Sequence, residues 1–272
     1  MLSEIQLKLN SLPVIFYINL DKRKDKRKYM EDQFELLNIK DYKRISADRF
    51  SVDNFSNWEH KIFGPKYNQI IRLSTLLNQF QIIIDWYDSN ISECCLIVED
   101  DVNFLVSKYW NFDWKYFFSN LPCNWDCVQL HIIGENFIPV GLTRRTRNNH
   151  SAACFLINRQ LAYKLKKMHY DKGKFHFYTN YGYGKNWPTY HYQSADFLPY
   201  EIGVTYSFPI FITNSDFNSD SYGYCSNFMA KKSDKIVLDW WKNKSKFYSL
   251  TDLFSLDTHK RNELMIPINY EN

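Results

Sequence analysis

The chain is organised around Cys94-Cys95-Leu96-Ile97-Val98-Glu99-Asp100-Asp101-Val102-Asn103-Phe104. A short apolar run, β-branched in part, ends abruptly in three carboxylates, and a run of this length is typical of a buried strand. Three acids cannot be buried without partners, so they must emerge at the end of the strand. In an open α/β sheet, ligands bind at the carboxyl ends of the strands. The stretch therefore predicts a metal site, and the alternative is an acidic turn that caps the next helix.

Length, composition and charge limit the class of protein. The 272 residues are 45% apolar and carry a formal charge of +4. This composition indicates a globular chain, and so small a charge does not favour nucleic acid as the main partner. The six cysteines form no paired Cys-x-x-Cys units, so no zinc site is expected. Neither a signal peptide nor an uncharged run of membrane-spanning length is visible. We therefore expect a cytoplasmic protein without a transmembrane segment, with peripheral membrane contact through Trp240-Trp241 left open.

Apolar periodicity predicts strands and helices that alternate along the chain. Strands are expected at 13–20, 42–48, 94–99, 125–130, 153–157 and 203–213, and helices from about 22 to 37, 66 to 87, 108 to 118 and after residue 158. The inner faces are expected to hold Met30, Phe34 and Leu37 in the first helix and Leu161, Leu165 and Met168 in the last. Residues 173–191 are interpreted as a loop.

Alternation of this kind favours a single α/β domain with a mainly parallel sheet in three layers. The domain is expected to span residues 1–226. Residues 227–272 are expected to form a C-terminal appendage, either packed on the domain or in contact with a membrane or a partner.

A second feature is the density of cations directly after the first predicted strand, in Asp21-Lys22-Arg23-Lys24-Asp25-Lys26-Arg27-Lys28. A solvated helix start would explain it, but helix starts prefer acids because the helix dipole is positive there. Arg23 and Arg27 lie one turn apart. A polyphosphate ligand would reconcile the cations with the dipole.

Taken in order, several segments resemble glycosyltransferase family 25, the lipopolysaccharide-type β-galactosyltransferases and collagen hydroxylysine galactosyltransferases. The resemblance rests on Ile18-Asn19-Leu20 with the basic residues after it, Arg44-Ile45-Ser46-Ala47-Asp48, Val98-Glu99-Asp100-Asp101-Val102, Cys154 to Leu165, Asp196-Phe197-Leu198, and Pro209 to Asp220. The set covers roughly residues 13 to 221. Two features depart from the family: its Gly-Cys-x-x-Ser-His has only Ser74-Thr75 as a counterpart, and its later strand has Phe155 in place of Tyr.

The resemblance implies a glycosyltransferase-A type, Rossmann-like fold, a UDP-sugar donor and a divalent metal, Mn²⁺ or Mg²⁺. Such a metal would stabilise the charge that builds on the β-phosphate as UDP leaves, and carboxylates suit these cations. By analogy with the Asp-x-Asp motif of the fold, Asp101 is expected to be a direct ligand, Asp100 a possible second one, and Glu99 a partner of the ribose or of a metal-bound water. The residues expected around the nucleotide are Asn19, Leu20, Ala47 and Asp48 at the uridine, and Arg23 and Arg27 near the ribose or phosphates.

Family members of this kind invert the anomeric centre, which requires a general base for the acceptor hydroxyl. Asp196 stands at the matching position and is the expected base, and the alternative is an ordinary acid before a helix. Further candidates are Asp220 and Asp216 as base or distal metal ligand, His150 and His191 at the metal or the sugar, and Tyr181, Tyr183 and Trp187 as an acceptor platform.

The expected function is therefore an inverting, metal-dependent hexosyltransferase of glycan biosynthesis, moving galactose, or next glucose, from a UDP-sugar to a hydroxyl on a glycan or hydroxylysine. A degenerate, non-catalytic transferase-fold binding module is the first alternative, although it would have no reason to keep three adjacent acids. A glycoside hydrolase would also use two carboxylates but would need no cationic segment. Nucleic-acid binding through residues 144–147 is least favoured.

Overall fold

The structure, a computed structural model, describes residues 2–51, 55–58, 62–63, 70–176, 194–214, 216–217 and 224–268. Its centre is a seven-stranded sheet in the order β2-β1-β4-β11-β6-β14-β9. These strands are β1 (Val14–Asn19), β2 (Tyr42–Ser46), β4 (Cys94–Glu99), β6 (Cys127–Gln129), β9 (Thr143–Arg144), β11 (Cys154–Asn158) and β14 (Thr205–Ser207). Short strands pair outside it: β3 (Ile62–Phe63), β5 (Val102–Asn103), β7 (Ile133–Gly134), β8 (Phe137–Pro139), β10 (Asn149–His150), β12 (Tyr170–Asp171), β13 (Lys174–His176), β15 (Ile212–Thr213) and β16 (Met265–Pro267).

Five strands of the central sheet run in one direction, so the prediction of a mainly parallel sheet is confirmed for them. β2 and β4 are parallel to β1. β11 is antiparallel to both β4 and β6, which gives β6 the direction of β4, and β14 is parallel to β6. β11 and β9 run the opposite way. The chain between β6 and β11 contains no crossover helix, and without one a returning strand pairs antiparallel. The α/β architecture is compatible with a Rossmann-like fold.

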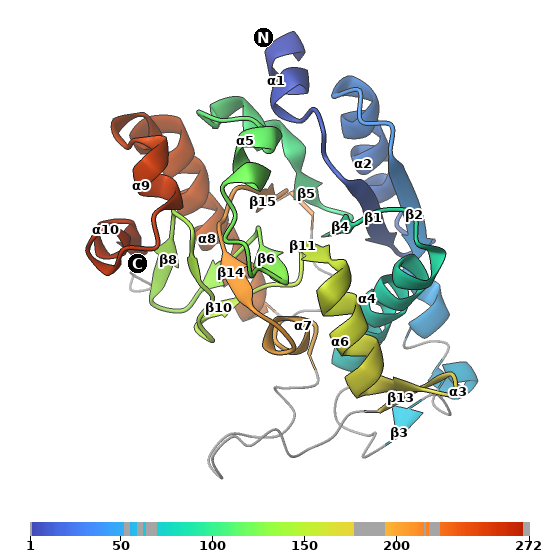
Figure 1. Cartoon of the computed structure of the whole chain (residues 1–272). Coiled ribbons are helices and arrows are strands. Elements are labelled where there is room, and N and C mark those ends of the chain that lie inside the picture. The colour runs from blue at the N-terminus through green and yellow to red at the C-terminus, as the bar shows by residue number, and fades with distance from the viewer. Residues whose placement is uncertain are drawn as a thin grey trace.

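Helices cover both faces of the sheet and make three layers, as the sequence predicted (Figure 1). Side chains alternate between the two faces of β1: Ile15 and Tyr17 pack with α2 and α8, whereas Val14 and Phe16 pack with α4 and α6. The helices are α1 (Leu2–Lys8), α2 (Lys24–Leu36), α3 (Phe55–Trp58), α4 (Ile70–Ser89), α5 (Trp114–Ser119), α6 (Arg159–His169), α7 (Leu198–Glu201), α8 (Tyr224–Asp239), α9 (Leu250–Phe254) and α10 (Thr258–Glu263), with shorter turns η1 (Ala47–Phe50), η4 (Phe104–Tyr109), η6 (Trp240–Lys244) and η7 (Ser245–Phe247).

The inner faces predicted for α2 and α6 are confirmed with one correction. Met30, Phe34 and Leu37 are buried in the same core as Ile15 and Tyr17 of β1. Leu161 and Leu165 of α6 are buried as well. Met168, however, is 41% exposed, because His169 takes the next inward position of α6. Its Nδ1 lies 2.9 Å from the carbonyl oxygen of His176, which fixes the end of the helix against β13.

Two predicted elements are divided in the structure. The helix expected at 108–118 separates into η4 and α5, since Asp113 caps α5 by accepting a hydrogen bond from the Tyr116 N–H at 2.7 Å. The strand expected at 203–213 separates into β14 and β15. Pro209 lies between them, and proline has no N–H to donate to a ladder.

The end of the chain packs into the same core as β1 and α2. Trp240 and Trp241 are 2% and 1% exposed, and the Trp241 indole N–H donates to the Pro209 carbonyl oxygen at 2.9 Å. Neither tryptophan is therefore exposed for the membrane contact that the sequence left open. The expected boundary after residue 226 falls inside α8.

A buried polar network joins α8 to the strand pair that follows the acids. Asp234 of α8 accepts hydrogen bonds from Thr213, at 3.2 Å from its N–H and 2.5 Å from its hydroxyl. Its other oxygen lies 2.8 Å from His131 Nε2, and His131 Nδ1 lies 2.5 Å from the Ser151 hydroxyl. Thr213 belongs to β15, which pairs with β5. α8 thus holds the segment next to the acidic stretch.

Asp234→Ala is expected to lower the free energy of unfolding by about 1–3 kcal/mol, because it leaves buried donors without an acceptor. Urea unfolding of the variant measures the loss. Asp239→Ala, on the exposed side of the same helix, is the control and should stay within about 0.5 kcal/mol of wild type. Equal stability of the two variants would contradict a structural role for the network.

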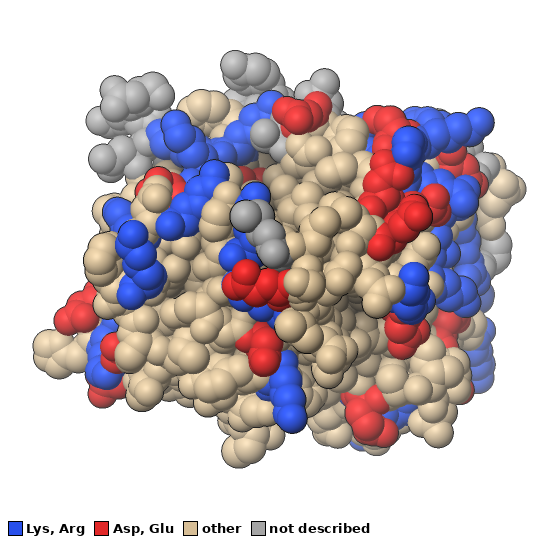
Figure 2. Space-filling model, turned by 90° about the horizontal axis from the view of Figure 1, so that it is seen from above, with Lys and Arg blue, Asp and Glu red and all other residues tan. Residues whose placement is uncertain are grey.

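Within the described ranges no helix is both long and apolar enough to cross a membrane. Figure 2 shows that on the face seen from above, Lys and Arg are interspersed with Asp and Glu and separated by broad areas of other residues.

Candidate functional site

The carboxyl ends of β1, β2 and β4 meet at one edge of the sheet. In the register of the ladders, Asn19 lies opposite Ser46, and Ile18 lies opposite Glu99. The segments after these strands therefore converge: Asn19 to Arg23, Ala47-Asp48, and Glu99 to Asp101. The sequence predicted this convergence from the strand ends, and the structure confirms the placement.

Asn19 is the connecting side chain at this edge and is 1% exposed. Its amide donates to Asp100 Oδ2 at 2.8 Å and to the Arg23 carbonyl oxygen at 3.1 Å. Its own oxygen accepts from Arg44 Nε at 3.0 Å. Every polar atom of the amide is thus used, and Asn19 fixes Asp100 relative to the start of α2. A role at the uridine stays a prediction.

The loop after β1 is tied to the end of β2. The Asp21 N–H donates to Asp48 Oδ2 at 2.7 Å, and the Ser46 hydroxyl donates to Asp21 Oδ2 at 3.0 Å. Arg44 also pairs with Asp21, and this pairing lowers the pKa of the Asp21 carboxyl. Next to them, the Ala47 carbonyl oxygen accepts from Asn78 of α4 at 3.0 Å, while Leu20 is half-buried.

Lys26 joins the two aspartates of the acidic stretch. Its ammonium lies 3.1 Å from Asp100 Oδ1 and 2.9 Å from Asp101 Oδ2, and the residue is 4% exposed. Burial acts to lower the pKa of Lys26, but the charges of Asp101 and Asp100 outweigh it and raise that pKa above its usual value. Burial likewise raises the pKa of Asp100, against the opposing effect of Lys26. The three side chains form a buried ion cluster.

The helix that carries Lys26 also holds the chain that leaves the acids. Gln33 of α2 donates to the Val102 carbonyl oxygen at 3.0 Å and accepts from the Phe104 N–H at 2.8 Å. The Asp101 carbonyl oxygen accepts from the Asn214 N–H at 2.8 Å. The backbone on both sides of Asp101 is therefore fixed by long-range hydrogen bonds.

Glu99 is the last residue of β4 and lies near enough to Asp196 for the charge of that aspartate to affect it. Burial raises the pKa of Glu99 to about 8, the charges of Asp101 and Asp196 add to the rise, and Lys26 opposes it. A carboxyl with such a pKa is mostly protonated at pH 7, so Glu99 is a hydrogen-bond donor there. The charge of Asp196 thus acts on the Glu99 carboxyl in the folded chain.

Glu99→Gln tests this protonation state. The folded chain holds a proton on Glu99 up to about pH 8, whereas the unfolded chain releases it near its ordinary value of 4.5. The stability that this proton contributes is complete below pH 4.5 and is lost as the pH rises to about 8. Relative to Glu99→Gln, wild type should become steadily less stable as the pH rises through this window.

Urea unfolding at constant ionic strength, at several values between pH 5 and pH 8, measures the difference. Glu35→Gln, on the exposed side of α2, is the control for removing a surface charge. A difference between wild type and Glu99→Gln that does not change with pH would contradict the raised pKa.

Asp196 is positioned by a buried arginine. Arg145 donates to the Asp196 carbonyl oxygen at 3.1 Å and to Glu201 Oε1 at 3.1 Å, and its side chain is 3% exposed. The Asp196 carboxylate accepts from the Ser194 hydroxyl at 3.1 Å. Asp196 directly precedes Phe197, the residue before α7, so its roles as a base and as a helix-start acid both stay predictions.

The two arginines expected at the phosphates are placed differently. Arg23 pairs with Asp25 at 2.9 Å and lies over the ring of Phe217, with 6.0 Å from the guanidinium carbon to the ring centroid. Lys26 lies over the same ring at 5.9 Å, so Arg23 stays next to the ion cluster. Arg27 pairs with Glu31 one turn along α2, and its side chain is 49% exposed.

The remaining candidates are dispersed. Asp216 is exposed and near Tyr29, whose pKa is raised by burial and by the charges of Asp101 and Asp216. His150 lies in β10, where its Nε2 lies 2.5 Å from Glu135 Oε1 and its ring contacts the ring of Phe197, the residue after Asp196, at 4.8 Å between centroids. The candidates Asp220, His191, Tyr181, Tyr183 and Trp187 lie outside the described residues.

The fit of a divalent ion can be judged from the oxygens of Asp100 and Asp101. Three of the four accept from nitrogen atoms of Asn19 or Lys26, and only Asp101 Oδ1 is buried without a partner. Mn²⁺ and Mg²⁺ take about six oxygen ligands. In the described ranges no group of three or more His, Cys, Asp or Glu side chains is arranged to hold a metal ion. The residues as arranged do not fit a divalent ion, and metal dependence stays a prediction.

Sequence reasoning named Lys26 only as part of a basic run and missed its position at the acids. The signal was available: Lys26 lies four residues before Met30 and eight before Phe34, which puts it on the buried face of α2. The buried side chain of Arg145, within the basic segment 144–147, was not predicted either. No local pattern distinguishes Arg145 from the exposed Arg144, because two of the groups that hold Arg145, Glu201 and the Asp196 carbonyl oxygen, lie 56 and 51 residues away.

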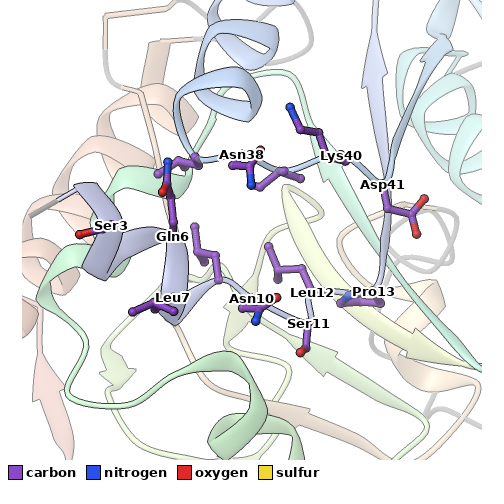
Figure 3. Close-up of a pocket in the computed structure, with 13 residues that line it drawn as sticks. Ser3, Gln6, Leu7, Asn10, Ser11, Leu12, Pro13, Asn38, Lys40 and Asp41 are labelled. Carbon is purple, nitrogen blue, oxygen red and sulfur yellow. The ribbon is translucent and has the colours of Figure 1, made fainter.

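A cavity of about 560 Å³ lies at the other end of β1 (Figure 3). It is lined by α1, by residues 9–13 before β1 and by residues 37–41 before β2. Asn19 lies six residues after Pro13, which lines the cavity, and this corresponds to about 20 Å of extended strand. It is therefore distinct from the acidic edge.

Comparison with known proteins adds little. No family model matches the sequence, and no curated protein matches it significantly. Among solved structures, the apo form of mouse xyloside xylosyltransferase 1 aligns over 95% of this chain and 90% of its own, with a TM-score of 0.28 and 9% identity. A likeness at this TM-score carries no argument about the fold or the function of this chain.

Proposed function

We propose that the chain is an inverting glycosyltransferase of glycosyltransferase-A type that moves a hexose from a UDP-sugar to an acceptor hydroxyl. Galactose is the first candidate and glucose the second, and the acceptor is a glycan or hydroxylysine. One observation carries the proposal. The segments that resemble glycosyltransferase family 25 are far apart in the sequence, yet those around Asn19, Asp48 and Glu99 meet at one sheet edge. Asp196 lies close enough to this edge for its charge to raise the pKa of Glu99.

In this proposal, the residues at this edge have different roles in an inverting displacement. The acceptor oxygen attacks the anomeric carbon from the face opposite UDP, and the bond from that carbon to the UDP oxygen breaks. Asp196, held by Ser194 and Arg145, takes the proton of the acceptor hydroxyl. Asn19, Asp48 and Arg23 border the nucleotide. Because the arrangement of Asp100 and Asp101 does not fit a divalent ion, no step is assigned to one.

A donor screen tests the function. The full chain is incubated with UDP-galactose or UDP-glucose and with glycan or hydroxylysine-peptide acceptors, and UDP release and the mass of the acceptor are both measured. We expect acceptor-dependent UDP release and a product heavier by one hexose. Binding of UDP without turnover would instead favour the degenerate binding module.

A glycoside hydrolase is the second candidate, because such enzymes also use a carboxyl group of raised pKa together with a second carboxyl group. Glu99, with a pKa of about 8, and Asp196 form such a pair. Release of a free sugar from an aryl glycoside, with no nucleotide present, would favour this reading over transfer.

A further inference from the structure

The ion cluster of Lys26, Asp100 and Asp101 occupies the position at which the acidic stretch was expected to hold a metal. The Lys26 ammonium lies within ion-pair distance of both aspartates, and its side chain is 5% exposed, compared with 11% for Asp100 and 16% for Asp101. A lysine ammonium is positively charged at neutral pH. The two carboxylates are therefore already partly neutralised by a group that belongs to the fold.

We propose that Lys26 is a built-in replacement for the divalent cation, so that this chain binds no Mn²⁺ or Mg²⁺ at Asp100 and Asp101 and acts without one. The ligand count supports this, since Asn19 and Lys26 together take three of the four aspartate oxygens. A divalent ion on the remaining oxygen would lie close to the ammonium, and two like charges at such a distance repel strongly in a buried site.

Lys26 is also held firmly in this position. It lies on the inner face of α2, one turn before the buried Met30, and its ammonium lies over the ring of Phe217 at 5.9 Å. Gln33 of the same helix is bonded to Val102 and Phe104. A metal ion that displaced the ammonium would break both of its ion pairs and its contact with the Phe217 ring.

The one oxygen left over, Asp101 Oδ1, suits a different ligand. It is buried and accepts no hydrogen bond from the residues that the structure describes. A single acceptor is insufficient for a Mn²⁺ ion but sufficient for one hydroxyl group, such as those of a sugar. Lys26 is in this view a positioning residue, which holds the Asp101 carboxylate in place through their ion pair. This part of the inference rests on the proposed transferase function, whereas the prediction about metal binding does not.

Direct measurement of Mn²⁺ binding tests the inference without relying on activity. The electron paramagnetic resonance signal of free Mn²⁺ is recorded during titration of the full wild-type chain, of Lys26→Ala and of Lys26→Ala combined with Asp101→Asn. Wild type should leave the signal unchanged. Lys26→Ala should bind at least about tenfold more tightly, because removal of the ammonium removes the repulsion and frees two oxygens. The added Asp101→Asn should abolish that gain.

Stoichiometric Mn²⁺ binding by wild type that Asp101→Asn removes would overturn the inference. This comparison does not require Lys26→Ala to fold. Sugar transfer that continues in excess EDTA would support the inference that the chain acts without a divalent ion. Transfer that stops in EDTA and returns with Mn²⁺ would overturn it while leaving the proposed function intact. Failure of the proposed function alone would appear as absence of transfer under all conditions in a wild-type chain that binds no Mn²⁺.

Discussion

Lys26→Ala is expected to lower the free energy of unfolding by about 3–5 kcal/mol, because it leaves two buried carboxylates without a counter-charge. Asp100 is 8% exposed, and the side chains of Asp100 and Asp101 are only 11% and 16% exposed, so water cannot replace the ammonium. Urea unfolding followed by circular dichroism measures the change.

Lys28→Ala is the matched control for this substitution. Lys28 lies in the same helix and pairs with Asp32, but their side chains are 75% and 58% exposed. Exposed pairs of this kind contribute little, so the change should stay below about 0.5 kcal/mol. If both lysine variants were equally stable, the ion cluster would not exist in solution as described.

Asp196→Asn is expected to reduce the turnover of sugar transfer by about 10²–10⁴-fold, because an amide cannot accept the proton of the acceptor hydroxyl. The KM for the UDP-sugar should change little, since asparagine keeps the shape of the side chain and can still accept from Ser194. Steady-state kinetics with the donor found in the screen provide both values. Asp239→Asn, exposed on α8, is the control for loss of an acid elsewhere.

The opposite result would identify the base differently. If Asp196→Asn transferred sugar at a nearly normal rate and Asp216→Asn carried the loss, the base would be Asp216, near Tyr29. A fall in the circular-dichroism signal of Asp196→Asn would show instead that the turn held by Arg145 had been disrupted, and would contradict a purely catalytic role.

Much of the secondary structure could be predicted because its causes are local. The apolar runs at β1 and β4 and the helical spacing of Met30, Phe34 and Leu37 are all patterns within a few residues of sequence. Failures occurred where a longer-range contact decides. Met168 is exposed because His169 is fixed by β13, and β11 is antiparallel because no helix separates it from β6.

The acidic edge itself follows from the sequence. A buried run that ends in Glu99-Asp100-Asp101 must place its charges at the end of a strand, and strands of one direction end at the same edge. The partners of those charges were decided only by the tertiary structure. Lys26 lies 74 and 75 residues before the two aspartates, and its pairing with them depends on how α2 packs on β4. Likewise, Glu99 stays protonated near neutral pH because folding removes water from it and brings Asp196 close, and neither effect has a local signature.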